Sequence, residues 1–153
     1  MATRANAAST DGRPVTNANF LVDLGLGDPT APGAGFAEVV VPAMRIDEPR
    51  SRAGTASSTG FADGDGATAN LILRRGVTGA LDLSAWWNRA RRGTAPRRRT
   101  VTVSLLGPNR EVVMRWRFRN ARPIALSYAP LRAMDGAVLM ETIEIAFDEM
   151  EIR

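Results

Sequence analysis

Side chains suited to acid–base or metal chemistry are scarce in this sequence. It contains neither histidine nor cysteine, and all 20 of its basic residues are arginines. Histidine is the usual general base near neutral pH and, with cysteine, the usual zinc ligand. The lysine of a phosphate-binding P-loop is missing as well. Carboxylates, hydroxyls and Tyr128 are left, so we expect no catalytic site, no metal, no cofactor and no enzyme.

Two acidic motifs are the remaining candidates for such chemistry. Glu141 and Glu144 are three residues apart in a segment that alternates like a strand, so they face opposite sides of a sheet and cannot share one site. The stretch DGDG at residues 63–66 resembles the beginning of a calcium-binding loop, but it lacks the later ligands and the terminal glutamate. Neither motif predicts a site.

The arginines are unevenly distributed along the chain. Fourteen of them lie between residues 71 and 132, where only Asp82 and Glu111 are acidic, whereas the last 21 residues hold six acids and one arginine. Charges separated in this way favour binding to an acidic partner or to another copy of the chain. Two groups stand out: a row of three, Arg115, Arg117 and Arg119, and an outer basic surface, Arg89, Arg91, Arg92, Arg97, Arg98 and Arg99.

An arginine-rich nucleic-acid-binding module is one hypothesis for these residues. Proteins that bind single strands place aromatic side chains beside the basic ones, so that bases stack on them. Here Trp116 and Phe118 alternate to the face opposite the row of three arginines. We therefore expect the arginines to face solvent or another copy of the chain, and nucleic-acid binding stays as the alternative.

The elements that must position these residues are mostly strands. Alternating apolar and polar residues, bounded by turn-forming residues, predict one domain over residues 19–153 after a flexible tail at residues 1–18. The fold class is mainly β (α+β): an antiparallel β-sandwich or barrel-like domain with one packed helix. The predicted strands cover residues 19–25, 36–41, 69–75, 100–106, 111–120, 124–128 and 137–147.

The single helix follows the third predicted strand. Asp82 or Ser84 is expected to cap its beginning, and Gly93 suits the left-handed position after its end. Arginines in its last turn are favoured by the helix dipole. We expect the apolar face of the helix to pack on the outer side of the sheet, through Leu83, Trp86, Trp87 and Ala90.

Residues 43–68 show little hydrophobic periodicity and are rich in glycine and serine. A structureless loop of this length is unusual inside a compact domain, so we predict an extended arm that becomes ordered against a neighbouring molecule. No apolar run approaches the about 20 residues of a membrane-spanning helix, and the beginning of the chain lacks a signal-peptide pattern. The chain is therefore expected in the cytoplasm.

Several motifs, in order along the chain, resemble the tail-tube (inner tube) proteins of contractile phage tails and bacterial contractile injection systems. They are FLVDLG, GFAEV, LILRRGVTGALDLSAWWNRAR, RRRTVTVSLL, VMRWRFRNARPIAL and METIEIAFDEMEI. The resemblance implies hexameric rings whose subunits share strands in one barrel, stacked into a tube with a central lumen. The implied partners are the chain itself, a sheath protein, a baseplate and a second tube paralogue, with a cargo effector in the lumen. Because residues 43–68 depart from the family pattern, a specialised tube-initiator, baseplate or tip subunit is the alternative.

This resemblance agrees with the sheet expected for one chain. Its edges are unpaired, and its strands are too few to enclose an aqueous bore, for which a barrel needs about 16 strands. Copies joined head to tail in a ring would cover the edges and open a channel.

The resemblance also implies roles for individual residues. The row of three arginines lines the lumen or faces a neighbour. Glu141, Glu144 and Asp148 pair with arginines of an adjacent copy. The particle is assembled in the cytoplasm and is then released or anchored to a membrane. Contacts with the next ring come from the arm, through Arg45, Asp47, Glu48, Arg50, Arg52 and Phe61.

Overall fold

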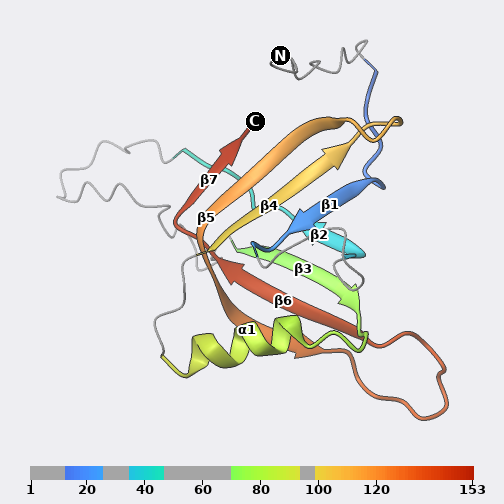
Figure 1. The fold of residues 1–153 in the computed structure, drawn as a ribbon. Helices are drawn as coiled ribbons and strands as arrows, with labels where there is room; N and C mark the ends of the chain where they lie inside the picture. The colour runs from blue at the N-terminus through green and yellow to red at the C-terminus, as the bar shows by residue number, and fades with distance from the viewer. Residues whose placement is uncertain (1–12, 26–34, 47–69, 94–98) are drawn as a thin grey trace, which may run out of the picture.

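The computed structural model describes residues 13–25, 35–46, 70–93 and 99–153 (Figure 1). The predicted tail up to residue 12 and most of the predicted arm fall outside these ranges. Seven residues with predicted roles also lie outside them: Asp47, Glu48, Arg50, Arg52, Phe61, Arg97 and Arg98.

The described chain forms antiparallel strands and one helix, as the predicted fold class requires. The strand order in the sheet is β1-β4-β5-β6-β3-β2, and β7 pairs with β5 beside this path. The bounds are β1 (Phe20–Asp23), β2 (Glu38–Val40), β3 (Leu71–Gly76), α1 (Asp82–Arg91), β4 (Arg99–Leu106), β5 (Val112–Tyr128), β6 (Met140–Ala146) and β7 (Glu149–Ile152).

Strand β5 organises the molecule because it belongs to two layers. Its first part pairs with β4 and β7, and its second part, from Arg122 on, pairs with β6. Figure 1 shows the two layers diverging from this shared strand, with β1 and β4 in the upper layer and β3 and β6 in the lower one. The predicted pair of strands at residues 111–120 and 124–128 is therefore one strand of 17 residues.

Two local features let β5 continue where the sequence predicted a break. Asn120 adopts a left-handed backbone conformation with φ 54°, next to a register shift in the pairing with β4. Asparagine tolerates this conformation better than most residues, and such irregularities bend a strand. Pro123 lies at the second register shift, opposite β6, where a proline is accommodated more easily than in a regular ladder.

The closing segment of the chain forms two strands rather than the single one predicted at residues 137–147. Strand β6 ends at Ala146, and β7 begins at Glu149 and continues along β5. The Asp148 amide donates a hydrogen bond to the Arg119 carbonyl at the junction. Because β5 bends near this point, its neighbour must break and restart to follow it.

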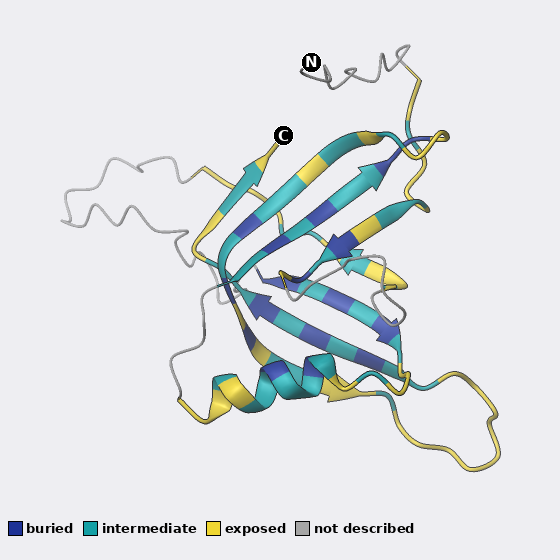
Figure 2. Cartoon of the chain, in the orientation of Figure 1, coloured by how far each residue is buried: buried dark blue, intermediate teal, exposed yellow. Residues whose placement is uncertain are grey.

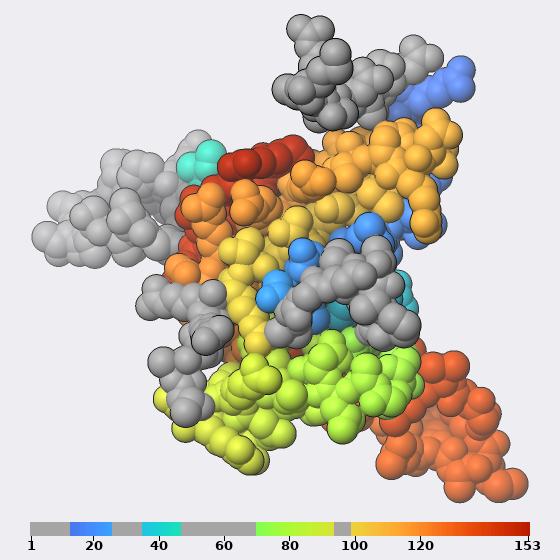
Figure 3. Space-filling model, viewed as in Figure 1, coloured from blue at the N-terminus to red at the C-terminus, as the bar shows by residue number. Residues whose placement is uncertain are grey.

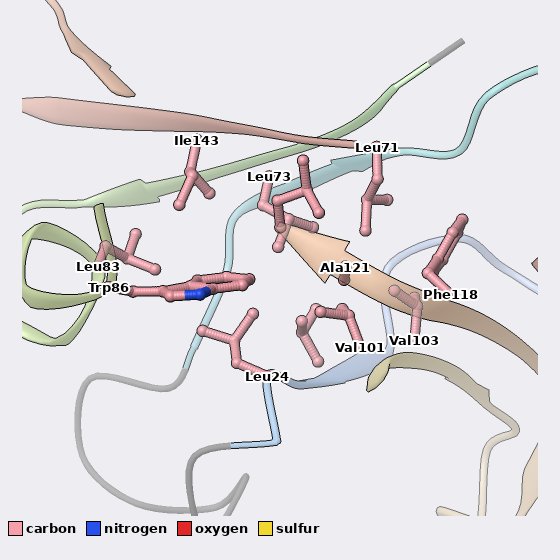
Figure 4. Packing of buried hydrophobic residues seen from close by; sticks show 12 residues of the cluster. Leu24, Leu71, Leu73, Leu83, Trp86, Val101, Val103, Phe118, Ala121 and Ile143 are labelled. Atoms are coloured by element: carbon pink, nitrogen blue, oxygen red, sulfur yellow. The ribbon is translucent and has the colours of Figure 1, made fainter. Parts of the chain in front are cut away.

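One core lies between the two layers. Burial alternates along β3 and β6, so that every second side chain points inward (Figure 2). The helix takes part in the same core: Trp86 is 2% exposed and lies between Leu73 and Ile143 on one side and Leu24 on the other (Figure 4). The apolar face of the helix thus packs against the sheet, as predicted, and burying the large Trp86 ring supplies much of the stabilisation. That this side of the sheet faces outward in a ring stays a prediction.

The ends of the helix agree with the prediction only in part. The N-cap residue is Leu81, which makes no side-chain capping bond, whereas Asp82 points to Arg75 and the Ser84 hydroxyl donates to the Leu81 carbonyl. Gly93 has φ 67° and stands in the left-handed position after the helix, as predicted.

The sheet is not closed. Within the described ranges β1 pairs only with β4, β2 only with β3 and β7 only with β5, so each presents one unpaired side. The helix, of 10 residues, falls well short of the length needed to cross a membrane, and the described part of the chain holds no other helix.

Candidate assembly surfaces

The row of three arginines lies on the outer face of the upper layer. Phe118 between them is fully buried in the core, so Arg117 and Arg119 point away from it. The Arg119 guanidinium forms an ion pair with Glu151 of β7 at 2.6 Å, and Arg117 is directly opposite Glu151 in the register. The predicted alternation along β5 is thus confirmed around Phe118, and part of the row is compensated within its own chain.

The rest of that outer face is also polar. In the register, Asp23 of β1 is opposite Thr102 of β4, and Thr102 is opposite Arg117. Trp116, which the nucleic-acid hypothesis would need beside the arginines, instead packs against the core. This face therefore offers charge and hydroxyl groups to water or a neighbour, without an aromatic platform for bases among the described residues.

A buried ion cluster joins β3, β6 and the helix. The Arg75 side chain is 1% exposed and donates from Nε to Glu141 Oε1 at 2.6 Å and from Nη1 to Asp82 Oδ2 at 3.3 Å. The Phe36 ring lies 5.4 Å from the guanidinium carbon, within reach of a cation–π interaction. Glu141 was expected to pair with an adjacent copy; its partner is Arg75 of the same chain, because both side chains lie on the inner sides of neighbouring strands.

The electrostatics of this cluster favour the charged states of Arg75 and Asp82. Burial disfavours the charged form of Arg75, but the hydrogen bonds and charges of Asp82 and Glu141 outweigh it and raise its pKa. Burial likewise acts to raise the pKa of Asp82, yet the bond and charge of Arg75 win and lower that pKa. The ion pair of Arg75 and Asp82 is therefore stable in its charged form and joins β3 to the helix.

Glu144 and Asp148 also have partners within their own chain. The Asn70 side-chain amide donates to Glu144 at 2.7 Å, and Arg122 pairs with Asp148 at 3.0 Å. Glu141 and Glu144 face opposite sides of β6, as predicted. Contacts of Glu144 and Asp148 with a neighbouring copy stay a prediction.

The basic end of the helix differs from the predicted outer surface at one residue. Arg89, Arg91 and Arg92 are exposed, as expected. Arg99, the first residue of β4, is half-buried instead, with its guanidinium carbon 4.9 Å from the centre of the Trp86 ring.

Of the four predicted packing residues, Leu83 and Trp86 are buried, whereas Trp87 and Ala90 are half-buried. The two adjacent tryptophans differ in burial because neighbouring residues on a helix point in directions about 100° apart. Trp86 therefore lies in the core and Trp87 at its boundary.

Sequence reasoning missed two features that bear on assembly. Arg75 was not singled out, although it alternates to the same inner face of the strand as Leu71 and Leu73. An arginine on a buried face needs an acidic partner, and this was the available signal. The other feature is the loop at residues 129–139 between β5 and β6, in which Leu131 is 82% and Met134 98% exposed. Figure 2 shows this loop as an exposed projection from the body of the molecule.

The beginning of the predicted arm is exposed as well. Met44, Arg45 and Ile46 carry no regular secondary structure, and Ile46 is 94% exposed. Contact of this segment with a neighbouring molecule stays a prediction.

Comparison with known proteins identifies the family. A family model described as T4-like virus tail tube protein gp19 matches residues 16–151. No curated protein matches the chain significantly in sequence.

Solved structures share the fold at low identity. A chain of the PVC sheath–tube complex of an extracellular contractile injection system, in its extended state, is 22% identical with a TM-score of 0.71, over 100% of this chain and 98% of that one. A chain of the anti-feeding prophage cap is 24% identical with a TM-score of 0.71, over 92% and 91%. Hcp1 from Flavobacterium johnsoniae is 13% identical with a TM-score of 0.52, over 87% and 93%. Since the family model spans nearly all of the chain, the chain belongs to the T4-like virus tail tube protein gp19 family.

Proposed function

We propose that this chain is the structural subunit of the inner tube of a contractile injection system or phage-tail-like particle. Copies form hexameric rings that stack around a central lumen, and the function lies in assembly and bore rather than in catalysis. The observation that carries this proposal is an open sheet in a chain that belongs to a tail tube family.

The open sheet explains why copies must join. Unpaired strand edges invite pairing with another chain, and seven strands are far fewer than the about 16 that enclose an aqueous bore. Strands from several copies in one barrel satisfy both conditions. In such a barrel the polar outer face of the upper layer, with the row of three arginines, faces the lumen or the joint between subunits.

The exposed apolar loop supplies a second contact between copies. Leu131 and Met134 stand almost fully in water in the single chain. Covering one such side chain contributes about 1.5–3 kcal/mol, so a ring or a stack that buries both gains substantially.

A sheath is the proposed outer partner. The PVC structure with this fold is a sheath–tube complex. Here the exposed arginines at the end of α1 form a basic surface that suits an acidic patch on a sheath protein or a neighbouring copy.

The proposal is tested by negative-stain imaging and sedimentation of the purified chain. We expect rings or tubes in the wild type. Charge reversal in Arg115→Glu, on the exposed part of the arginine row, should reduce them while the unfolding midpoint stays unchanged. Arg110→Glu, in the exposed β4–β5 turn, is the matched control. Monomers at every concentration tested, with and without a sheath partner, would contradict the proposal.

A specialised position at the end of the tube is the second candidate. A chain of the PVC sheath/tube terminator has a TM-score of 0.72, close to that of the sheath–tube complex. Gold labelling of a tagged copy in intact particles separates the two: label along the whole tube supports the bulk subunit, and label only at one end supports the specialised one.

A further inference from the structure

Two hydrogen-bond donors between α1 and the start of β4 are buried, and no acceptor for them is found among the described residues. Trp86 Nε1 and Arg99 Nη1 are both shielded from water and have no hydrogen-bond partner in the part of the chain that the structure describes. The Arg99 guanidinium lies over the Trp86 ring, so the two side chains form one site. Figure 3 shows the outside of this region, where the start of β4 (yellow) adjoins the helix (green to yellow-green).

An arrangement of this kind is costly in the isolated chain. A buried donor without an acceptor costs about 1–3 kcal/mol, and more when it is charged. Burial lowers the pKa of Arg99, and the positive charge of Arg89 lowers it further. Burial thus disfavours the charged guanidinium and Arg89 repels it, and a carboxylate, which can accept from both donors at once, is the group that would relieve both effects.

The described acids of the same chain are mostly engaged. Glu38, Asp82, Glu141, Asp148 and Glu151 form ion pairs, and Glu144 accepts from Asn70. Asp23 and Glu111 accept from backbone amides close to them in sequence, whereas Asp135 and Glu149 are exposed and have no side-chain partner within the described ranges.

Asp135 is placed to serve a second molecule. It follows Met134 in the projecting β5–β6 loop, whereas Glu149 is opposite Arg119 on the outer face of the sheet. In Figure 1 the loop extends beyond one end of the helix, and the basic C-terminal end of α1 lies at the other. A loop that leaves one side of the molecule and a receptor on the other side suit a head-to-tail contact, which closes into a ring by rotation.

We propose that Trp86 and Arg99 form a receptor for a carboxylate of a second copy of this chain, and that Asp135 in the β5–β6 loop supplies it. This inference rests on the proposed assembly of copies and names one of its joints. The apolar side chains of the loop cover the receptor, and the carboxylate gives the contact its register.

The absence of lysine from the sequence allows a direct test. Arg99→Lys introduces a single amine-bearing side chain at the receptor, and a carbodiimide then links that amine to any carboxylate in contact with it. We expect a covalent dimer whose linked peptides, identified by mass spectrometry, join position 99 of one chain to Asp135 of another. Adding Asp135→Asn should abolish the dimer. Arg91→Lys, exposed in the last turn of the same helix, is the matched control and should give little of it.

A second variant covers the case in which Arg99→Lys fails to assemble. Arg99→Met removes the charge but keeps the apolar stem over Trp86. The unfolding midpoint of the monomer should not fall, because an unpaired buried charge is lost. The protein concentration needed for rings should rise roughly tenfold, as expected for a lost charge-assisted contact.

The outcomes separate this inference from the proposed function. A link within one chain, a link to a different acid, or assembly of Arg99→Met at the wild-type concentration would overturn the receptor while wild-type rings still stand. Failure of the wild type itself to form rings would overturn the proposed function.

Discussion

At the scale of single residues, Arg75 shows how a charge is held inside this core. Its side chain is 1% exposed and two carboxylates from different elements contact it. Taking an arginine out of water is expensive, and the attraction to its partners offsets that cost only while both geometry and charge are intact. The main role of Arg75 is therefore to set the arrangement of β3, β6 and the helix, and its net contribution to stability is small.

Removing the arginine should leave the carboxylate of Glu141 buried without compensation. We expect Arg75→Met to lower the free energy of unfolding by about 3–5 kcal/mol in urea titrations. The adjacent Arg74 pairs with Glu38 on the surface, with both side chains at least 42% exposed, so Arg74→Met should cost less than about 1 kcal/mol. Equal losses in the two variants would contradict the role assigned to Arg75.

The acid dependence of stability should report on Asp82. Its pKa is lowered in the folded chain, so its contribution is complete above the unfolded pKa of about 3.9 and is lost as the pH falls through the lower folded value. The stability difference between the wild type and Asp82→Asn should therefore be largest near neutral pH and shrink below about pH 4. Urea titrations at pH 7 and pH 3 measure it, and a difference that grows on acidification would show that the assigned sign is wrong.

At the scale of elements, the sequence pattern predicted features that neighbouring residues determine, such as the face of a strand on which a side chain lies. It missed features that depend on residues distant in sequence, such as pairing partners and the ends of strands. The alternation along β6 correctly placed Glu141 and Glu144 on opposite sides, but the identity of the partner of Glu141 depends on register with β3. The turn-like residues around Asn120 predicted a break, whereas pairing with three other strands keeps β5 continuous. The short β7 was missed because it exists only alongside β5.

The bend in β5 gives a prediction at this scale. Asn120 has φ 54°, a conformation that glycine adopts freely and β-branched residues strongly resist. We expect Asn120→Val to lower the free energy of unfolding by about 1–3 kcal/mol, while Asn120→Gly changes it little. Thermal unfolding of both variants tests this, and equal tolerance of valine and glycine would show that the bend does not depend on this residue.

At the scale of the whole molecule, the order of motifs predicted the family and the class of fold, and both are confirmed. Amphipathic periodicity also predicted that the helix has an apolar face, but this periodicity does not show which residues of the core receive that face. Roles that depend on neighbouring copies, such as that of Arg115, are likewise not encoded in the pattern of a single chain.

The exposed β5–β6 loop gives the prediction that belongs to this scale. Leu131→Asp combined with Met134→Asp places charges at positions that are 82% and 98% exposed in the single chain. We expect the unfolding midpoint of the monomer to change little, since neither side chain contributes to the core. Ring formation, followed by sedimentation velocity, should be strongly reduced, because two charges would have to be buried at a joint. The control Arg132→Gln alters the same loop without adding a buried charge, and loss of rings in the control alone would refute this placement of the joint.

The central claim is that the open sheet of one chain is completed by its copies around a common axis. End-on class averages of the purified chain by electron cryo-microscopy test this most directly. The account predicts closed rings of six-fold symmetry around an open bore, with strands of adjacent copies continuing one barrel. A population of single molecules at all concentrations, or rings in which each subunit keeps its sheet edges apart from its neighbours, would contradict it.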